Sequence, residues 1–332
     1  MKVAINGLGR IGRAALKQIL EHKELTLIAA NDLVPADNLA YLLNFDTVYG
    51  RYSKRVEADP EGLRINGQKI LLFSEKDPSK LPWKKLEVGL VFECTGVFTK
   101  KEDLFKHLQA GARKVILSAP AKDNEISTVV YGVNHDSGST IKVVSCASCT
   151  TNCITPVVEV MSRRIGLKKA IMTTIHAYTS TQAVVDGPNK KMRRGRAGAA
   201  NFVPTSTGAA KATTRVLPQL KGKFDGVAVR GPVPVGSLAD LVFVTERRTS
   251  VEEVNGIFDE EAESERYRDI LAVTRDPLVS SDIIGQSHAS VVDLAMTQVV
   301  DGDLVKVMSW YDNEWGYVRQ MIREATHLSG QS

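Results

Sequence analysis

The sequence predicts an α/β protein in which a Rossmann-type doubly wound parallel sheet precedes an α+β domain with a mainly antiparallel sheet. In the first half of the chain, short apolar runs alternate with helical patterns, as in parallel sheets covered on both faces. In the second half, strand-like runs follow one another with few helices between them. A chain of 332 residues fits two domains at about 150 residues each.

The first half contains five apolar runs that we expect to form parallel strands, at residues 2–6, 25–30, 90–94, 114–118 and 141–144. Residues 10–22 fit an amphipathic helix, because apolar side chains recur there at helical spacing. The second half predicts a helix at 149–166, a helix at 250–262 capped by Ser250 and a terminal helix at 318–328. Its expected strands are 170–177, 225–229, 237–245, 270–274, 290–293 and 304–310.

Composition excludes several classes of protein. Hydrophobic residues make up 43% and charged residues 24%, values that are typical of globular domains and not of disordered chains. The longest apolar runs are under about 10 residues, far short of the roughly 20 that a membrane helix needs. The start of the chain lacks the apolar segment of a secretory signal, and four cysteines are too few for a disulfide framework. We therefore expect a reduced, cytoplasmic protein without a membrane partner.

A glycine-rich turn follows the first expected strand. Gly7, Gly9 and Gly12 form G-x-G-x-x-G between a strand and a helix, and Asp32 follows the second strand. In dinucleotide-binding folds such glycines allow a tight turn, the approach of a pyrophosphate and close helix–strand packing. A carboxylate at the end of the second strand suits the ribose hydroxyls of NAD and repels a 2′-phosphate. The alternative is an ordinary turn beside a strand-end aspartate.

Three cysteines gather between residues 146 and 153. Cys149 lies where a strand gives way to a helix, and the positive end of the helix dipole is expected to lower the pKa of its thiol. A metal site is one alternative, but C-x2-C-x3-C supplies only three thiolates, so no metal is expected. Packing of buried cysteines is the other alternative. His176 closes a later strand, and the pattern alone leaves a catalytic and a structural role equally open.

Nine ordered motifs resemble phosphorylating glyceraldehyde-3-phosphate dehydrogenases from residue 2 to about 324. They are INGLGRIGR (5–13), AANDL (29–33), CTGVFT (94–99), VILSAPA (115–121), YGVNHD (131–136), ASCTTNC (147–153), TTIHAYTSTQ (173–182), PTSTGAAKAT (204–213) and SWYDNEWGY (309–317). The resemblance implies a domain at 1–148 that binds NAD, a catalytic domain at 149–312 and a C-terminal helix at 313–332 that returns to the first. It also implies a homotetramer.

The resemblance assigns roles by position. Cys149 corresponds to the nucleophile that forms a hemithioacetal and then a thioester with D-glyceraldehyde 3-phosphate, and His176 to the proton acceptor. Inorganic phosphate then releases 1,3-bisphosphoglycerate. Positions that match NAD contacts are Gly7, Gly9, Arg10, Ile11, Gly12, Asp32, Lys76, Ser118, Ser180 and Asn313. Thr179, Thr181 and Arg230 match the site for the substrate phosphate, and Ser148, Thr150, Arg194, Thr207 and Gly208 the site for the attacking phosphate.

Several alternatives stay open. An erythrose-4-phosphate dehydrogenase would share the same Cys and His motifs, and some relatives with the same aspartate accept NADP. The basic run 190–196 fits a surface loop, whereas nucleic-acid binding as the main role is not expected because no aromatic residue interleaves it. Cys146 stands where relatives usually have asparagine, which raises the hypothesis of a Cys146–Cys149 or Cys149–Cys153 disulfide under oxidative stress.

Overall fold

The computed structural model describes residues 1–138 and 141–330, which form two compact units. The first unit consists of the described parts of Met1–Val129, Asn134–Ala147 and Met321–Ser332. The second consists of Val130–Val133 and Ser148–Gln320. The chain therefore enters the second unit twice and completes the first with its C-terminal residues. The expected domain boundaries stay a prediction.

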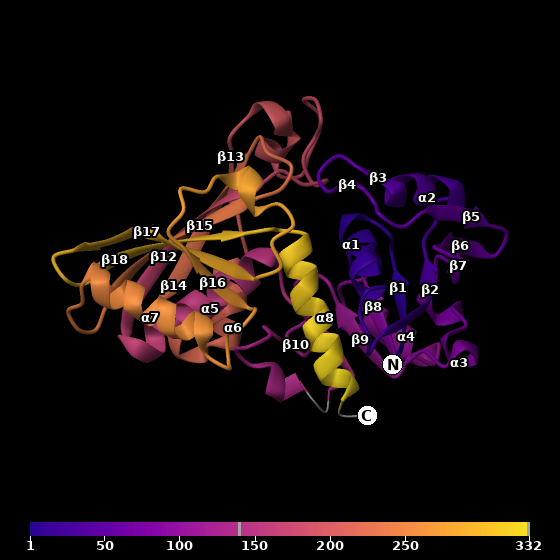
Figure 1. Cartoon of the computed structure of the whole chain (residues 1–332), viewed down its shortest axis with the longest axis horizontal. Helices are drawn as coiled ribbons and strands as arrows, with labels where there is room; N and C mark the ends of the chain where they lie inside the picture. Colours follow the sequence, from indigo (N-terminus) through magenta and orange to yellow (C-terminus); the bar gives the residue numbers. More distant parts are fainter. Residues whose placement is uncertain (139–140, 331–332) are drawn as a thin grey trace. The chain divides into compact units, whose positions relative to one another are not determined.

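The first unit contains a nine-stranded sheet in the order β10-β11-β9-β8-β1-β2-β7-β6-β5 (Figure 1). Seven strands form parallel pairs. Edge strand β10 pairs with β11, and the six inner strands are β7 (Gln68–Phe73), β2 (Thr26–Asn31), β1 (Lys2–Asn6), β8 (Leu90–Glu93), β9 (Lys114–Leu117) and β11 (Val143–Ser145). This is the doubly wound order, in which the chain runs outward from β1 first on one side and then on the other. Crevices of such sheets open at the carboxyl ends of the strands beside that reversal.

Helices and edge strands complete the first unit. The helices are α1 (Arg10–Ile19), α2 (Ala36–Asn44), α3 (Trp83–Leu86) and α4 (Lys101–Gln109). The edges carry β10 (Ser127–Thr128) on one side and the antiparallel strands β6 (Gly62–Ile65) and β5 (Val56–Asp59) on the other. A separate pair is formed by β3 (Phe45–Asp46) and β4 (Gly50–Arg51). All four residues of β8 are buried, as expected of a strand with both faces covered.

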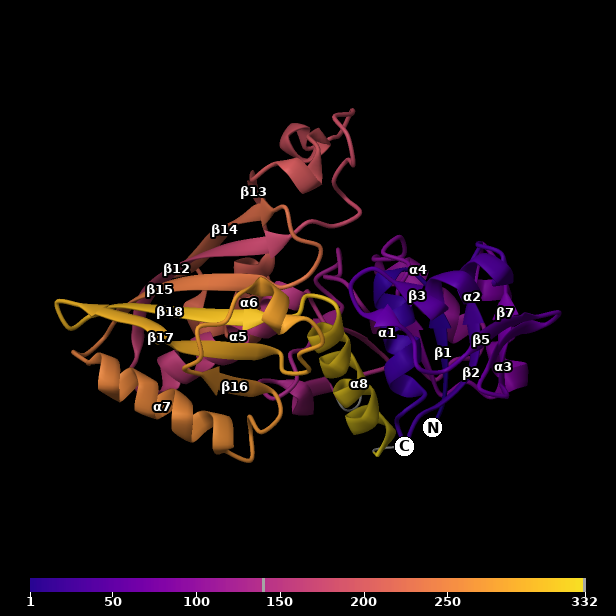
Figure 2. The ribbon, with the colours of Figure 1, turned by 45° about the horizontal axis from the view of Figure 1, so that its top comes forward.

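The second unit is built on a seven-stranded sheet in the order β13-β14-β12-β15-β18-β17-β16, which Figure 2 shows as a row of arrows. The strands are β12 (Leu167–Ala177), β13 (Val203–Ser206), β14 (Phe224–Gly231), β15 (Ser237–Thr245), β16 (Leu271–Thr274), β17 (Ser290–Val300) and β18 (Leu304–Tyr311). Four pairings are antiparallel, whereas β12–β14 and β16–β17 are parallel. The expected mainly antiparallel sheet and the doubly wound first sheet are both confirmed.

Helices bury one face of this second sheet. They are α5 (Cys149–Arg164), α6 (Ala209–Val216) and α7 (Val251–Glu263). Their apolar side chains, such as Val157, Val216 and Phe258, share one core with Phe243 and Val307 of the sheet. The chain ends in α8 (Trp315–Ser329), which begins three residues before the expected start. In the described part of the chain, no helix is long and apolar enough to cross a membrane.

Candidate active site

Cys149 is the first residue of α5, and the backbone before it is bent sharply. Ala147 has φ 54°, a left-handed conformation that is uncommon for alanine and turns the chain between β11 and α5. Ser148 is the N-cap, because its hydroxyl oxygen accepts a hydrogen bond from the backbone N–H of Thr151 at 3.2 Å. Cap and turn together hold the Cys149 thiol, which is half-buried, at the N-terminus of a 16-residue helix.

His176 lies beside this thiol, near the end of β12. Its Nε2 is 3.4 Å from Cys149 Sγ, so the expected pairing of the two side chains is geometrically sound. Its Nδ1 lies 2.7 Å from the carbonyl oxygen of Ala177. A proton on Nδ1 donates to that carbonyl and leaves the lone pair of Nε2 facing the thiol. In that tautomer Nε2 can accept the thiol proton, whereas in the other tautomer Nδ1 accepts from Arg230 Nη1, 2.8 Å away, and the Nε2 proton faces the sulfur.

Arg230 adds a positive charge on the far side of the imidazole. Its Nη1 donates to the Ala177 carbonyl oxygen at 2.9 Å and lies 2.8 Å from His176 Nδ1. Burial, followed by the charge of Arg230, lowers the pKa of His176 to about 3. Burial also raises the pKa of Cys149, although Arg230 and Thr150 act in the opposite direction. The expectation that the helix dipole gives a low thiol pKa is therefore wrong, because desolvation outweighs the N–H groups of the helix terminus.

Tyr311 was not expected at the site, and it joins the two catalytic elements. Its hydroxyl lies 3.0 Å from Thr150 Oγ1 on α5 and 2.7 Å from Thr174 Oγ1 on β12. Its ring packs edge-on against His176, with 5.9 Å between ring centroids. The side chain is fully buried, so these bonds fix the separation of helix and strand. Only the SWYDNEWGY motif hinted at a function here.

Asn313 is oriented by a short relay that starts on β12. The backbone N–H of Ala177 donates to Ser237 Oγ at 3.1 Å, so the hydroxyl proton of Ser237 points away from it. That hydroxyl donates to Asn313 Oδ1 at 2.9 Å. The Asn313 oxygen is thereby engaged, and its amide NH2 is the group presented to a ligand. Ser237 is thus a positioning residue that sequence reasoning missed.

The residues expected to bind phosphate fall into a different grouping from the predicted one. Thr179 and Thr181 lie together, with 2.9 Å between their hydroxyl oxygens. Arg194 donates to Thr181 at 3.4 Å and to Thr205 at 3.0 Å, whereas Arg230 contacts His176. Arg194 is thus hydrogen-bonded to Thr181, and Arg230 to the Ala177 carbonyl oxygen, while the phosphate-binding roles of both stay predictions.

The other members of that predicted set take local roles. Ser148 caps α5, and Thr150 bonds to Tyr311. The Thr207 hydroxyl accepts from the backbone N–H of Ala209 at 3.2 Å, at the start of α6. Gly208 is exposed, and a Cβ built on it would meet no atom of the described residues within 4 Å. The N-terminus of α6 is therefore open to an anion.

A separate cavity of about 390 Å³ lies in the first unit, at the carboxyl ends of its central strands. Gly7 has φ 91°, and a Cβ on it would lie 2.7 Å from the backbone nitrogen of Thr95. A Cβ on Gly12 would lie 1.9 Å from the carbonyl oxygen of Gly7, whereas one on Gly9 would meet nothing among the described residues within 4 Å. Two glycines thus allow close packing, and Gly9 leaves room for a pyrophosphate at the N-terminus of α1.

Asp32 stands at the wall of this cavity with its carboxylate fixed. Its Oδ2 accepts from the backbone N–H of Leu8 at 2.6 Å and its Oδ1 from that of Val34 at 3.0 Å. Lys76 also lines the cavity. Arg10, expected to touch NAD, donates to Asp46 at 2.5 Å. The remaining expected contacts lie elsewhere on the two units: Ile11 and Ser118 are half-buried in the first, and Ser180 is exposed in the second.

A buried polar network supports the cavity from behind, and sequence reasoning missed it. Glu93 is fully buried, and its Oε2 accepts from Asn6 Nδ2 at 2.6 Å and lies 3.1 Å from His107 Nε2. Its Oε1 accepts from the backbone N–H of Thr95 at 2.8 Å and from the Thr95 hydroxyl. Trp83 Nε1 donates to His107 Nδ1 at 3.1 Å, so the proton of that ring is on Nε2 and points at Glu93.

This network reaches the cavity wall directly. Asn6 Oδ1 accepts from Asn31 Nδ2 at 2.7 Å, and Asn31 Oδ1 accepts from the backbone N–H of Glu75 at 2.8 Å. Asn6, Asn31, Glu75 and Thr95 all line the cavity. A charged residue in the otherwise apolar run LVFE was the one signal that could have revealed the network.

Comparison with known proteins identifies both units. The family model "Glyceraldehyde 3-phosphate dehydrogenase, NAD binding domain" matches residues 1–101, and "Glyceraldehyde 3-phosphate dehydrogenase, C-terminal domain" matches residues 148–313. Curated relatives match over full length. Glyceraldehyde-3-phosphate dehydrogenase 2 of Streptomyces avermitilis is 47% identical over 100% of this chain and 99% of its own. Glyceraldehyde-3-phosphate dehydrogenase of Geobacillus stearothermophilus is 46% identical over the same shares, and that of Clostridium pasteurianum is 47% identical over 99% and 98%.

Proposed function

The chain belongs to the glyceraldehyde-3-phosphate dehydrogenase family, and from that premise we propose how its residues carry out the reaction. It is an NAD-dependent oxidoreductase that converts D-glyceraldehyde 3-phosphate and inorganic phosphate to 1,3-bisphosphoglycerate. The relatives compared above are all named for the three-carbon substrate, and none supports the erythrose-4-phosphate alternative. The single observation that carries the mechanism is the 3.4 Å separation of Cys149 Sγ and His176 Nε2.

In the first step, Cys149 adds to the aldehyde. His176 Nε2 takes the thiol proton, and the sulfur forms a bond to the carbonyl carbon while the π electrons move to oxygen. The same Nε2 returns the proton to that oxygen, which gives a hemithioacetal on Cys149. Because both groups are neutral at rest, the pair gains charge only when substrate is in place. Desolvation therefore opposes premature ionisation of the thiol.

Oxidation of the hemithioacetal is the second step. NAD+, when bound, supplies the hydride acceptor. His176 takes the hydroxyl proton as the hydride leaves carbon, and the carbon–oxygen double bond re-forms as a thioester on Cys149. Inorganic phosphate then adds to the thioester carbon, and the collapse of that adduct breaks the carbon–sulfur bond and releases the acyl phosphate. The Cys149 thiolate leaves with the electron pair and recovers its proton from His176.

The chain's own groups fit NAD at the cavity of the first unit. Gly9 gives the pyrophosphate room at the N-terminus of α1, and Asp32 presents a carboxylate to the ribose hydroxyls. In the second unit, Asn313 presents its amide NH2, and we assign it to the nicotinamide carboxamide. Asp32→Ala is expected to lower the preference for NAD over NADP at least tenfold, measured as the ratio of kcat/KM for the two coenzymes. An unchanged ratio would contradict this role.

We assign the phosphate groups of substrate and product to the hydroxyls and arginines of the second unit. Thr179, Thr181 and Arg194 form one cluster, and the open N-terminus of α6 with Thr207 and Gly208 forms another. Arg230 Nη1 donates to the Ala177 carbonyl oxygen. Arg194→Ala tests the first cluster and Thr207→Ala the second, because loss of the substrate site raises KM for the aldehyde and loss of the other raises KM for phosphate.

A homotetramer in the cytoplasm completes the proposal. The face of the second sheet opposite its helices carries exposed apolar side chains, with Ile171 at 60% and Val227 at 52%. Phe202 in the neighbouring loop is 72% exposed. A patch of this kind on a sheet suits burial against a second copy. All four cysteines carry free thiols, as expected in a reducing compartment. Light scattering coupled to size exclusion tests the tetramer.

The activity is tested by NADH formation at 340 nm with D-glyceraldehyde 3-phosphate, inorganic phosphate and NAD. Cys149→Ser is expected to abolish the rate, and His176→Asn to lower kcat by about 10²–10⁴. Cys153→Ser is the matched control, because Cys153 lies one turn further along α5 with its thiol against Ser290 and Ser309 in the core. A rate that persists in Cys149→Ser, or that needs no phosphate, would overturn the mechanism.

A further inference from the structure

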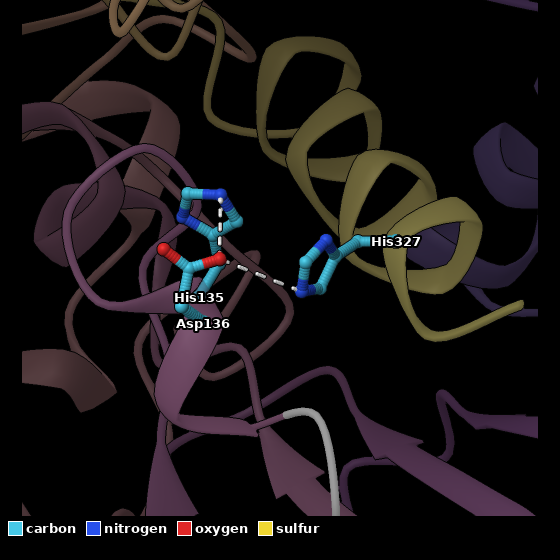
Figure 3. A group of neighbouring side chains, drawn as sticks. All are labelled: His135, Asp136 and His327. Atoms are coloured by element: carbon cyan, nitrogen blue, oxygen red, sulfur yellow. Dashed lines mark ion pairs between the residues drawn. The ribbon is translucent and has the colours of Figure 1, made fainter. Parts of the chain in front are cut away.

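Two histidines and an aspartate meet in the first unit, at a place the proposed function does not use. His135 and Asp136 lie in the 3-10 turn His135–Gly138, and His327 lies on α8. Figure 3 shows both imidazole rings at the carboxylate of Asp136, one from each element. His135 Nε2 lies 3.6 Å and His327 Nε2 3.9 Å from Asp136 Oδ1. One ligand atom from each of the three side chains falls within 4.8 Å of the others.

These separations are close to those of a metal centre. Bonds of about 2.0–2.2 Å in a tetrahedral site place ligand atoms about 3.4 Å apart. The two measured nitrogen–oxygen separations therefore need to shorten by a few tenths of an ångström. The two rings meet edge to face with centroids 4.9 Å apart, and small rotations about their side-chain bonds can bring both nitrogens to one ion.

The charges around the cluster favour a cation. Glu324 lies on α8 one turn before His327, so both side chains are on the same side of the helix. Its side chain is fully buried, and neither carboxylate oxygen accepts a hydrogen bond from any described residue. Burial, followed by repulsion from the Asp136 carboxylate, raises the pKa of Glu324 to about 8. The Lys114 ammonium attracts Glu324 but also donates to the Leu328 carbonyl oxygen at 2.6 Å. A dication at Asp136 would offset this repulsion.

We propose that His135, Asp136 and His327 bind a divalent transition-metal ion, zinc in the first instance, and so clip α8 to the 135–138 turn. Two imidazole nitrogens and one carboxylate oxygen are a zinc-type donor set, and solvent completes the coordination because the Asp136 side chain is 86% exposed. Magnesium and calcium ions do not suit this donor set, because they prefer oxygen donors to imidazole nitrogens. The expectation of no metal came from cysteine spacing, which is blind to side chains that meet from distant parts of the chain.

The test uses the full chain with Cys149→Ser, so that the active-site thiol does not compete for metal. Calorimetric titration with Zn²⁺ is expected to give one site per chain, and titration with Mg²⁺ none. Co²⁺ is expected to bind at the same site without the intense near-ultraviolet absorption of a cobalt–thiolate bond. At a hundredfold excess over Kd, Zn²⁺ is expected to raise the melting temperature by about 5 °C or more.

Variants then locate the site. His327→Gln and His135→Gln are each expected to weaken Zn²⁺ binding more than tenfold. The control variant is His288→Gln, which changes a half-buried histidine of the second unit and is expected to leave Zn²⁺ binding unchanged. If either glutamine variant melts abnormally without metal, Asp136→Asn decides, because that side chain is exposed. Unchanged binding in these variants, thiolate absorption with Co²⁺, or no binding in the parent would each overturn the proposal. NADH formation by the chain with Cys149 intact is measured separately and reports on the proposed function alone.

Discussion

Glu93→Gln tests whether the buried network behind the cofactor cavity holds the cavity in shape. The substitution keeps the size of the side chain but replaces one oxygen with an NH2 group. At the Oε2 position that group would face the donors of Asn6 and His107, and at the Oε1 position the backbone N–H of Thr95. His107 cannot relieve the clash by changing tautomer, because Trp83 already donates to its Nδ1. At least one buried donor therefore loses its acceptor in either orientation.

The magnitude follows from these contacts. An unsatisfied buried N–H costs about 1–3 kcal/mol, and replacing a charged acceptor by a neutral one weakens the remaining bonds. We expect the free energy of unfolding to fall by about 2–5 kcal/mol and the melting temperature of the first unit by about 5–15 °C. NAD should also bind about tenfold more weakly, because Asn6 and Thr95 line the cavity.

Calorimetric melting and NAD titration measure both effects. The matched control is Glu87→Gln, since the Glu87 side chain is 73% exposed and its ion pair with Lys2 is at the surface. That change should alter stability by less than about 0.5 kcal/mol. Combining Glu93→Gln with Trp83→Phe frees the tautomer of His107, so the two losses should not add. If Glu93→Gln melts and binds NAD like the parent, or if the losses add fully, the reasoning is refuted.

Three further predictions concern the catalytic site. Burial holds His176 neutral and lowers its pKa in the folded chain to about 3, against an ordinary 6.5. The unfolded chain therefore binds more protons between these pH values, and the free energy of unfolding rises with pH across that window. His176→Asn should flatten this pH dependence in melting curves, and an unchanged slope would contradict the assignment. Iodoacetamide should label Cys149 before Cys153, whose thiol is fully buried with its pKa raised to about 12, and mass spectrometry of short reactions would reveal the opposite order. Tyr311→Phe should lower stability by about 1–3 kcal/mol, because Thr150 and Thr174 lose their shared buried partner, and a melting temperature equal to the parent would rule out that bridge.

The sequence predicted those elements of the fold that are determined by residues adjacent in the chain. Buried parallel strands are continuous apolar runs, so β1, β8 and β9 were located to within a residue or two. The edge strands β5 and β6 were missed, because each is only four residues long and contains charged residues such as Glu57 and Arg64 in place of a continuous apolar run. Neither parallel pairing in the second sheet could be predicted, since pairing partners lie far apart in the chain.

The candidate site divides in the same way. Cys149 at a helix start and His176 at a strand end could be proposed from their neighbours in sequence, and the fold brings them together. The direction in which the pKa of the Cys149 thiol shifts could not be predicted. It depends on burial, and side chains from β12, β14 and β18 pack over the helix terminus. The hydrogen-bond partners of Arg194 and Arg230 could not be predicted either, since each long side chain can bond to any of several nearby oxygen atoms.

The first unit contains residues from both before and after the second unit, and this affects the order of folding during synthesis. Its buried residues include Met321, Ile322 and Leu328, which are synthesised after the second unit. Domains usually fold in the order in which they leave the ribosome. Here residues 148–320 are all synthesised before residues 321–330, which complete the first unit. A chain that stalls before residue 321 would carry the parts for the thiol and its base, together with a first unit that lacks residues 321–330.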